Sequence, residues 1–252
     1  MNNGMERMAE RNKRGRAENV IQNALTALPS ILEDISGENL IETSKEDVKH
    51  DATLLMRYYT STMARTVSVT QVPPPEQDVQ PMSLMDWMFD LTKTNMKSMY
   101  DGCEGWGWDD DGKYKELDHE DARFLVVSCS SADSSKRSTT RGVKKVENPV
   151  AFVHMRYETE ARVPIVYVYE IQVSKEHRGL KLGWWLMKSV EALGQFFTFS
   201  LVMLTVFCNN VQAREFYSRL GYSVDPSSPA EDCQDNPGYL ILSKRIDSMK
   251  KN

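Results

Sequence analysis

One carboxylate, inside an apolar run, is the residue of this sequence best placed to do chemistry. Glu170 interrupts the stretch Val163–Val173, VPIVYVYEIQV, in which most residues are apolar, β-branched or aromatic. Such a composition predicts a buried strand. A charge in that setting costs several kcal/mol unless it is paired, neutralised or used. Glu170 is therefore either a salt-bridged structural residue or a functional acid or base, and the strand alone favours the structural interpretation.

A loop that could bind an anion follows this strand. Arg178, Gly179 and Gly183 precede a segment with apolar residues at helical spacing: Leu186, Val190, Leu193 and Phe197. Glycines before a helix let backbone N–H groups point at an anion, which the positive end of the helix dipole also attracts. Arg178 adds a fixed positive charge, so we expect a phosphate ligand. Glycine-containing turns also serve purely steric needs, and the loop by itself leaves both interpretations open.

The spacing in this loop resembles a known family. Arg178 to Gly183 is similar to the R-x-x-G-x-G loop with which the GNAT superfamily of N-acetyltransferases binds the pyrophosphate of acetyl-CoA. Lys181 stands where that family usually has its first glycine. A lysine can still offer its N–H group, but we expect it to lose a backbone angle that is open only to glycine.

A second pattern farther along the chain resembles the same family. Leu201–Phe207 predicts a buried strand, Asn210 then caps a helix, and Gly221 closes that helix. The resemblance implies an α/β (α+β) fold, in which helices flank a central mixed, mostly antiparallel sheet. The order of the predicted elements, strand, helix, strands, helix, strand, helix and strand, agrees with such a sheet.

The remaining elements follow from hydrophobic periodicity and from capping residues. Ser83 and Asp86 form a capping-box pattern at the start of a helix predicted over 83–100. Strands are predicted over 66–72, 124–129 and 149–158, the last of them in a hairpin with Val163–Val173. Three prolines at 73–75 predict an extended linker.

Polar segments suggest how the chain is divided. We expect an N-terminal helical extension over 1–50, an acetyltransferase domain over 51–246 with a mobile insertion over 130–148, and a tail over 247–252. The basic cluster near the start of the extension is a nuclear address, an anchor for an acidic partner, or a solvated helix face. The acidic segment 101–121, with Trp106 and Trp108, is either a solvated loop or a surface for a basic peptide.

Composition argues against several classes of function. A net charge of −5 and a pI near 5.5 argue against general nucleic-acid binding. The cysteines and histidines show no metal-ligand spacing, so we expect reduced thiols and no metal. No apolar run approaches the ~20 residues that span a bilayer, and the N-terminus is not signal-like. We therefore expect a soluble, intracellular monomer without direct nucleic-acid or membrane partners.

Further phrases narrow the resemblance to the enzymes of this superfamily that acetylate histone N-termini. They are DLTKTNMKSMY (90–100), GWGW (105–108), YVYEIQV (167–173), VMLTVF (202–207) and DPSSP (225–229). The resemblance covers the chain from about 83 to 243. It implies direct transfer of acetyl from acetyl-CoA, in a ternary complex, to the α-amine of histone H4 and histone 2A, whose tails begin Ser-Gly-Arg-Gly. It also implies a location in the nucleus and cytoplasm.

This narrower resemblance assigns roles to individual residues. Residues implied at the cofactor are Ile171, Gln172, Val173, Arg178, Gly179, Leu180, Lys181, Leu182, Gly183, Trp184 and Asn210. Residues implied around the substrate peptide are Tyr100, Glu158, Thr159, Glu160, Tyr169, Thr205, Ser227 and Tyr239. Glu170 and Glu158, one or both through water, are expected to accept the proton of the substrate amine. Glu158 stands where the resembling enzymes have an aspartate. Tyr217 either protonates the leaving thiolate or is a packed helix tyrosine.

Three other functions remain open from the sequence. An acetyltransferase with the same cofactor loop could act on lysine side chains or on a small amine. A module that binds acetyl-CoA without turnover would keep the loop but need no base. A protein that only binds histones through its acidic segment would not depend on Glu170.

Overall fold

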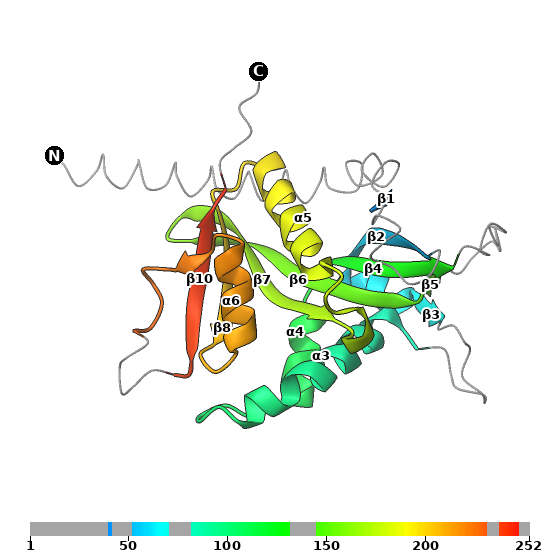
Figure 1. The fold of residues 1–252 in the computed structure, drawn as a ribbon, viewed down its shortest axis with the longest axis horizontal. Coiled ribbons are helices and arrows are strands. Elements are labelled where there is room, and N and C mark those ends of the chain that lie inside the picture. Colours follow the sequence, from blue (N-terminus) through cyan, green and yellow to red (C-terminus); the bar gives the residue numbers. More distant parts are fainter. Residues whose placement is uncertain (1–39, 42–51, 71–81, 132–144, 231–236, 247–252) are drawn as a thin grey trace, which may run out of the picture. The chain divides into compact units, whose positions relative to one another are not determined.

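The computed structural model describes residues 40–41, 52–70, 82–131, 145–230 and 237–246 (Figure 1). The predicted N-terminal helix with its basic cluster, the proline linker, most of the insertion and the C-terminal tail lie outside these residues. The chain forms two compact units. Of the described residues, those up to His154 together with Glu170–Leu186 form the N-terminal unit, and Met155–Tyr169 together with those from Met187 onward form the C-terminal unit.

The N-terminal unit is built on antiparallel strands. In it β1 (Leu40–Ile41), β2 (Ala52–Thr60), β4 (Arg123–Ser131) and the first part of β6 (Pro149–Glu160) are neighbours in that order, and the last part of β7 (Val163–Val173) follows β6. β2 and β4 pair along their whole length, from Ala52↔Ser131 to Thr60↔Arg123. β3 (Ser68–Thr70) and β5 (Lys145–Glu147) form a separate parallel pair.

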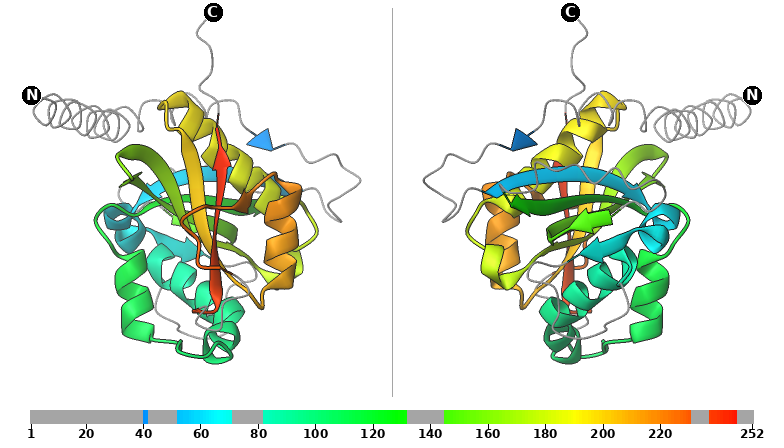
Figure 2. Two further views of the ribbon diagram at one scale, coloured as in Figure 1. Left: turned by 90° about the vertical axis from the view of Figure 1, so that its left-hand side faces the viewer. Right: turned by 90° about the vertical axis from the view of Figure 1, so that its right-hand side faces the viewer.

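Two helices on the same side of β4 position the candidate site of this unit (Figure 2). α3 (Leu84–Asp101) begins where its sequence predicts: the Ser83 hydroxyl accepts from the Asp86 N–H at 3.0 Å and donates to the Asp86 carboxylate at 2.7 Å. The helix buries apolar side chains from its first turns against strand residues. This core includes Leu84, Met85, Trp87, Met88, Leu117, Phe124, Val126 and Phe152. α4 (Asp110–Leu117) follows α3 and adds Leu117 to the same core.

The C-terminal unit, taken by itself, has strands with mixed pairing. In it β6, β7, β8 (Leu201–Phe207), β10 (Tyr239–Arg245) and β9 (Ser223–Val224) are neighbours in that order. β7 runs parallel to β8, from Ile165↔Leu201 to Val168↔Leu204, and β10 runs antiparallel to β8. Most of α5 (Leu182–Phe196) and all of α6 (Val211–Arg219) belong to this unit. The predicted mixed, mostly antiparallel sheet with flanking helices is therefore confirmed.

The structure corrects three details of the predicted elements. The strand predicted over 66–72 is shorter, because Thr66 ends α2 (Ser61–Thr66) and the strand covers Ser68–Thr70. β5 lies at the end of the predicted insertion. Within the acidic segment, Asp110–Leu117 is helix α4 rather than loop, because Asp109 caps its N-terminus and acidic residues in a first turn favour the helix dipole.

Candidate active site

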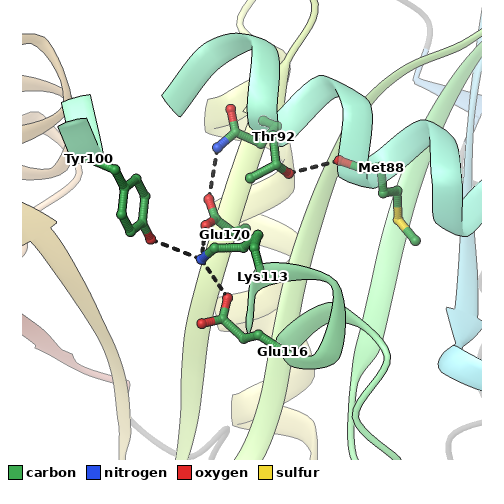
Figure 3. A network of polar contacts seen from close by, with 7 residues as sticks. Met88, Thr92, Tyr100, Lys113, Glu116 and Glu170 are labelled. Atoms are coloured by element: carbon green, nitrogen blue, oxygen red, sulfur yellow. Dashed lines mark hydrogen bonds and ion pairs between the residues drawn. The ribbon is translucent and has the colours of Figure 1, made fainter. Parts of the chain in front are cut away.

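The carboxylate of Glu170 is buried in β7 and neutralised by a buried partner. Its side chain is 6% exposed, and the Lys113 ammonium from α4 lies 2.9 Å from Oε1 (Figure 3). Gln172 donates from Nε2 to the other oxygen, Oε2, at 2.8 Å. Each carboxylate oxygen therefore accepts one protein hydrogen bond and keeps acceptor capacity for a further donor.

Lys113 is as deeply buried as its partner and is surrounded by three oxygens. Its ammonium donates to Glu170, to Glu116 Oε1 at 2.8 Å and to the Tyr100 hydroxyl at 2.9 Å. Burial lowers the pKa of Lys113, but the carboxylates of Glu170 and Glu116 outweigh it and hold this pKa above its usual value. Burial and the charge of Glu170 raise the pKa of Tyr100, so the tyrosine is a neutral phenol at physiological pH.

A chain of amide hydrogen bonds links Glu170 to the loop that follows β7. Gln172 accepts at Oε1 from Asn95 Nδ2 at 2.9 Å, and Asn95 Oδ1 accepts from Arg178 Nη2 at 2.7 Å. The Asn95 amide also donates to the Val173 carbonyl at 3.3 Å. Asn95, on α3, therefore holds both the side chain that contacts the carboxylate and the arginine of the anion-binding loop.

That loop has the backbone geometry of an anion site. After the 3-10 helix η1 (Lys175–His177), Gly179 has φ of +83° and Lys181 has φ of +59°, and α5 then begins at Leu182. The first N–H groups of a helix have no intrahelical partner, so those at the start of α5 can bind a phosphate. The expectation that lysine would lose the glycine angle is wrong, because Lys181 adopts a left-handed conformation that costs about 1–2 kcal/mol.

The backbone of β7 extends beyond its parallel ladder. Pairing with β8 ends at Val168, whereas β7 continues to Val173. Backbone groups of Ile171 and Val173 are thus candidates to bond an extended ligand such as the pantetheine arm. Of the cofactor set expected from the sequence, Ile171 to Val173 and Arg178 to Trp184 lie in the N-terminal unit, whereas Asn210 lies in the C-terminal unit.

Several predicted substrate residues gather on one face of the C-terminal unit. The Tyr169 hydroxyl donates to Glu158 Oε1 at 2.6 Å, and the Arg156 guanidinium lies 4.1 Å from the centroid of the Tyr169 ring. Tyr167, two residues before Tyr169 and so on the same face of β7, has its hydroxyl 2.5 Å from that of Thr205. This face therefore combines a positioned carboxylate with tyrosine walls.

Some other predicted residues of this unit have local partners, whereas Glu160 and Tyr239 lie near enough to Tyr167 for their charges to contribute to raising its pKa, which burial raises most. Ser227 donates from its hydroxyl to Asp225 at 2.6 Å. Asn210 caps α6 as expected, accepting from the Ala213 N–H at 3.1 Å. Tyr217 is 6% exposed, and its ring lies 5.9 Å from that of Tyr222, which supports the packed-tyrosine alternative. Three further predicted residues are Thr159 and Glu160 at the end of β6 and Tyr239 at the start of β10.

Metal-ligand groups and membrane-spanning helices are both absent from the described residues. In the described ranges, no group of three or more His, Cys, Asp or Glu side chains could hold a metal ion. None of the described helices is both long and apolar enough to cross a bilayer. Among the described residues, Cys103, Cys129 and Cys208 form no disulfide bond.

Sequence reasoning missed two residues that hold this site together. Lys113 lies in a segment whose acidic composition predicts solvent exposure, but it is four residues before the buried Leu117 and so on the same helix face. Asn95 lies three residues after the buried Thr92 on α3. A polar side chain at a core-facing helical position was the available signal in both cases.

A family model matches this architecture over residues 93–222, more than half of the chain: the acetyltransferase (GNAT) family. The chain belongs to this family, which uses acetyl-CoA. Within the family the chain is similar to N-alpha-acetyltransferase 40 of Saccharomyces cerevisiae, the enzyme also called NatD, with 37% identity over 78 residues. That match covers 28% of this chain and 27% of the relative. The predicted resemblance to NatD is thereby confirmed.

Solved structures of acetyltransferases are also similar to the chain. One is the paiA N-acetyltransferase of Thermoplasma acidophilum in complex with coenzyme A, 12% identical, with 76% of this chain and 98% of that one covered and a TM-score of 0.47. Another is an acetyltransferase of Streptococcus agalactiae, 9% identical, with 77% and 98% covered and a TM-score of 0.48.

Proposed function

We propose that this chain transfers the acetyl group of acetyl-CoA to the α-amine of histone H4 and histone 2A tails that begin Ser-Gly-Arg-Gly, in the nucleus and cytoplasm. Family membership supports acetyl transfer, and the similarity to an N-alpha-acetyltransferase supports an N-terminal acceptor. The observation that carries the proposal is the buried, ion-paired and doubly hydrogen-bonded carboxylate of Glu170 beside the anion-binding loop.

The residues of the loop are suited to acetyl-CoA. The helix start at Leu182 and the charge of Arg178 suit a diphosphate, and the φ values of Gly179 and Lys181 turn the chain into that helix. The end of β7 would offer backbone groups to the pantetheine arm. A backbone N–H in Ile171–Val173 would also polarise the thioester oxygen.

The acceptor must lose a proton before it attacks. An α-ammonium has a pKa of about 7.7–8.0, so much of it is protonated at physiological pH. Glu170 accepts that proton directly or through water, a role that typically contributes about 10²–10⁴-fold to the rate. The neutral amine then bonds to the thioester carbon, the carbon–sulfur bond breaks, and coenzyme A leaves with a proton.

Electrostatics supports a basic peptide as the acceptor. In the C-terminal unit, Glu158 is held by the Tyr169 hydroxyl and Glu160 lies two residues farther on, so carboxylates are available to an arginine of the peptide. Two of the three acids at 109–111 have structural partners. Asp109 caps α4, and Asp110 forms an ion pair with Lys93 at 2.6 Å.

The test is acetyl transfer to a histone H4 N-terminal peptide, compared with the same peptide carrying a blocked α-amine. Labelling of the free α-amine alone is the expected result. Equal labelling of both peptides would assign the activity to lysine side chains and overturn the proposal. Binding of acetyl-CoA without labelling of either peptide would identify a binding module.

A further inference from the structure

The Lys113–Glu170 pair has features that packing alone does not require. Both side chains are more than nine-tenths buried, and each makes further polar contacts. Burying two charges is often no more stabilising than placing apolar residues at the same positions. Here the Lys113 ammonium forms an ion pair with Glu170, the carboxylate to which the proposed function assigns proton transfer.

We propose that Lys113 is a positioning residue for the acetyl-transfer reaction, which keeps the Glu170 carboxylate ionised and fixes its direction. The inference rests on the proposed function, because Lys113 acts through Glu170 and does not touch the reacting atoms.

The electrostatic part follows from the groups that face Glu170. In the described part of the N-terminal unit these are Lys113 and Glu116 from α4, Tyr100 from α3, and the neutral amide of Gln172 from β7. Lys113 is the cation of this set, and a nearby opposite charge favours the ionised carboxylate. Without it, burial and the charge of Glu116 would both favour the protonated acid, which cannot accept a proton.

The geometric part follows from where the hydrogen bonds fall. Lys113 binds Oε1 and Gln172 binds Oε2, so the carboxylate is held from both sides. Its remaining acceptor directions are therefore fixed as well. The same ammonium binds the hydroxyl of Tyr100, a residue expected at the substrate, and so couples that side chain to the carboxylate.

The experiment compares three variants in acetyl transfer to the histone H4 peptide across a range of pH. Lys113→Met removes the charge, Lys113→Arg keeps it, and Lys115→Met is the matched control, because Lys115 is an exposed lysine of the same helix. For Lys113→Met we expect kcat to fall. The low-pH side of the plot of kcat against pH, its acidic limb, should move up by about 1–3 pH units, whereas KM for acetyl-CoA should be unchanged. Lys113→Arg should keep the limb of the wild type, and Lys115→Met should match the wild type throughout.

A second measurement does not depend on turnover. The Glu170 carboxyl is titrated by ¹³C NMR, and its signal is assigned by its loss in Glu170→Gln. In Lys113→Met its pKa should rise by about 1–3 units. If methionine prevents folding, Lys113→Gln removes the charge while keeping a hydrogen-bond donor and gives the same readout.

A double variant separates positioning from a merely structural role. In the Glu170→Gln background, Lys113→Met should cause no further loss of kcat. An unchanged Glu170 pKa in the charge-removing variant would overturn the inference. So would a fall in kcat on adding Lys113→Met to Glu170→Gln that equals the fall it causes in the wild type. If the wild type does not acetylate the peptide, the proposed function fails, whereas the NMR titration still decides whether Lys113 sets the ionisation of Glu170.

Discussion

Replacing Asn95 by alanine should weaken both the fold and the cofactor loop. The change removes the donor to Gln172, whose side chain is 4% exposed, and leaves a buried amide oxygen without it. An unsatisfied buried acceptor costs about 1–3 kcal/mol. Loss of the hydrogen bond to Arg178 adds little to this free-energy cost, because the Arg178 side chain is exposed and water replaces the lost acceptor. Alanine recovers about 0.5–0.7 kcal/mol of helix propensity.

The free energy of unfolding should therefore fall by about 1–2 kcal/mol, measured by urea denaturation with circular dichroism. Since Arg178 and Gln172 both lose a contact that orients them, KM for acetyl-CoA should rise and kcat should fall. Thr94→Ala, at an exposed position one residue earlier, is the control and should stay within about 0.5 kcal/mol of the wild type. If the two variants were equally stable, the hydrogen-bond chain through Asn95 would not have the role described.

Three further substitutions test single structural features by their effect on thermal or urea unfolding. Lys181→Gly relieves a left-handed backbone but adds unfolded-state entropy, so a net gain of about 0.5–1 kcal/mol is expected, and a loss would contradict the strain. Gly194→Ala places a Cβ 2.4 Å from Ile246 Cδ1 and 3.3 Å from Val166, and should cost about 1–3 kcal/mol despite the better helix propensity of alanine. Adding Ile246→Val removes the clashing methyl, and failure to recover stability would refute the packing argument. Ser83→Ala should cost about 0.5–2 kcal/mol, since α3 loses its cap; an unchanged midpoint would show that the cap is not needed.

Elements with a short-range signal could be predicted from the sequence. The β-branched run of β7, the cap of α3 at Ser83 and the cap of α6 at Asn210 are all where the sequence predicts. The hairpin between β6 and β7 is also confirmed. Its turn at Ala161 and Arg162 has positive φ at both residues, as two-residue hairpins of type I′ require.

Contacts between distant segments could not be predicted in this way. Lys113 and Glu170 are separated by 57 positions, and Asn95 and Arg178 by 83. Each contact depends on how α3 and α4 pack on the strands, and no local pattern encodes that packing. The acidic composition around Lys113 also concealed it, because the surrounding charges predict solvent exposure rather than a buried lysine.

The central claim is that the Glu170 carboxylate removes the proton of the substrate amine. Its most direct test is the single-turnover rate of acetyl transfer to the free-amine histone H4 peptide by Glu170→Gln, with the exposed Glu176→Gln as control. Near pH 7 the rate for Glu170→Gln should fall by about 10²–10⁴-fold, and it should recover as the pH passes the amine pKa of about 7.7–8.0. Binding of acetyl-CoA should be unchanged. A Glu170→Gln variant as fast as the control at pH 7 would contradict the account.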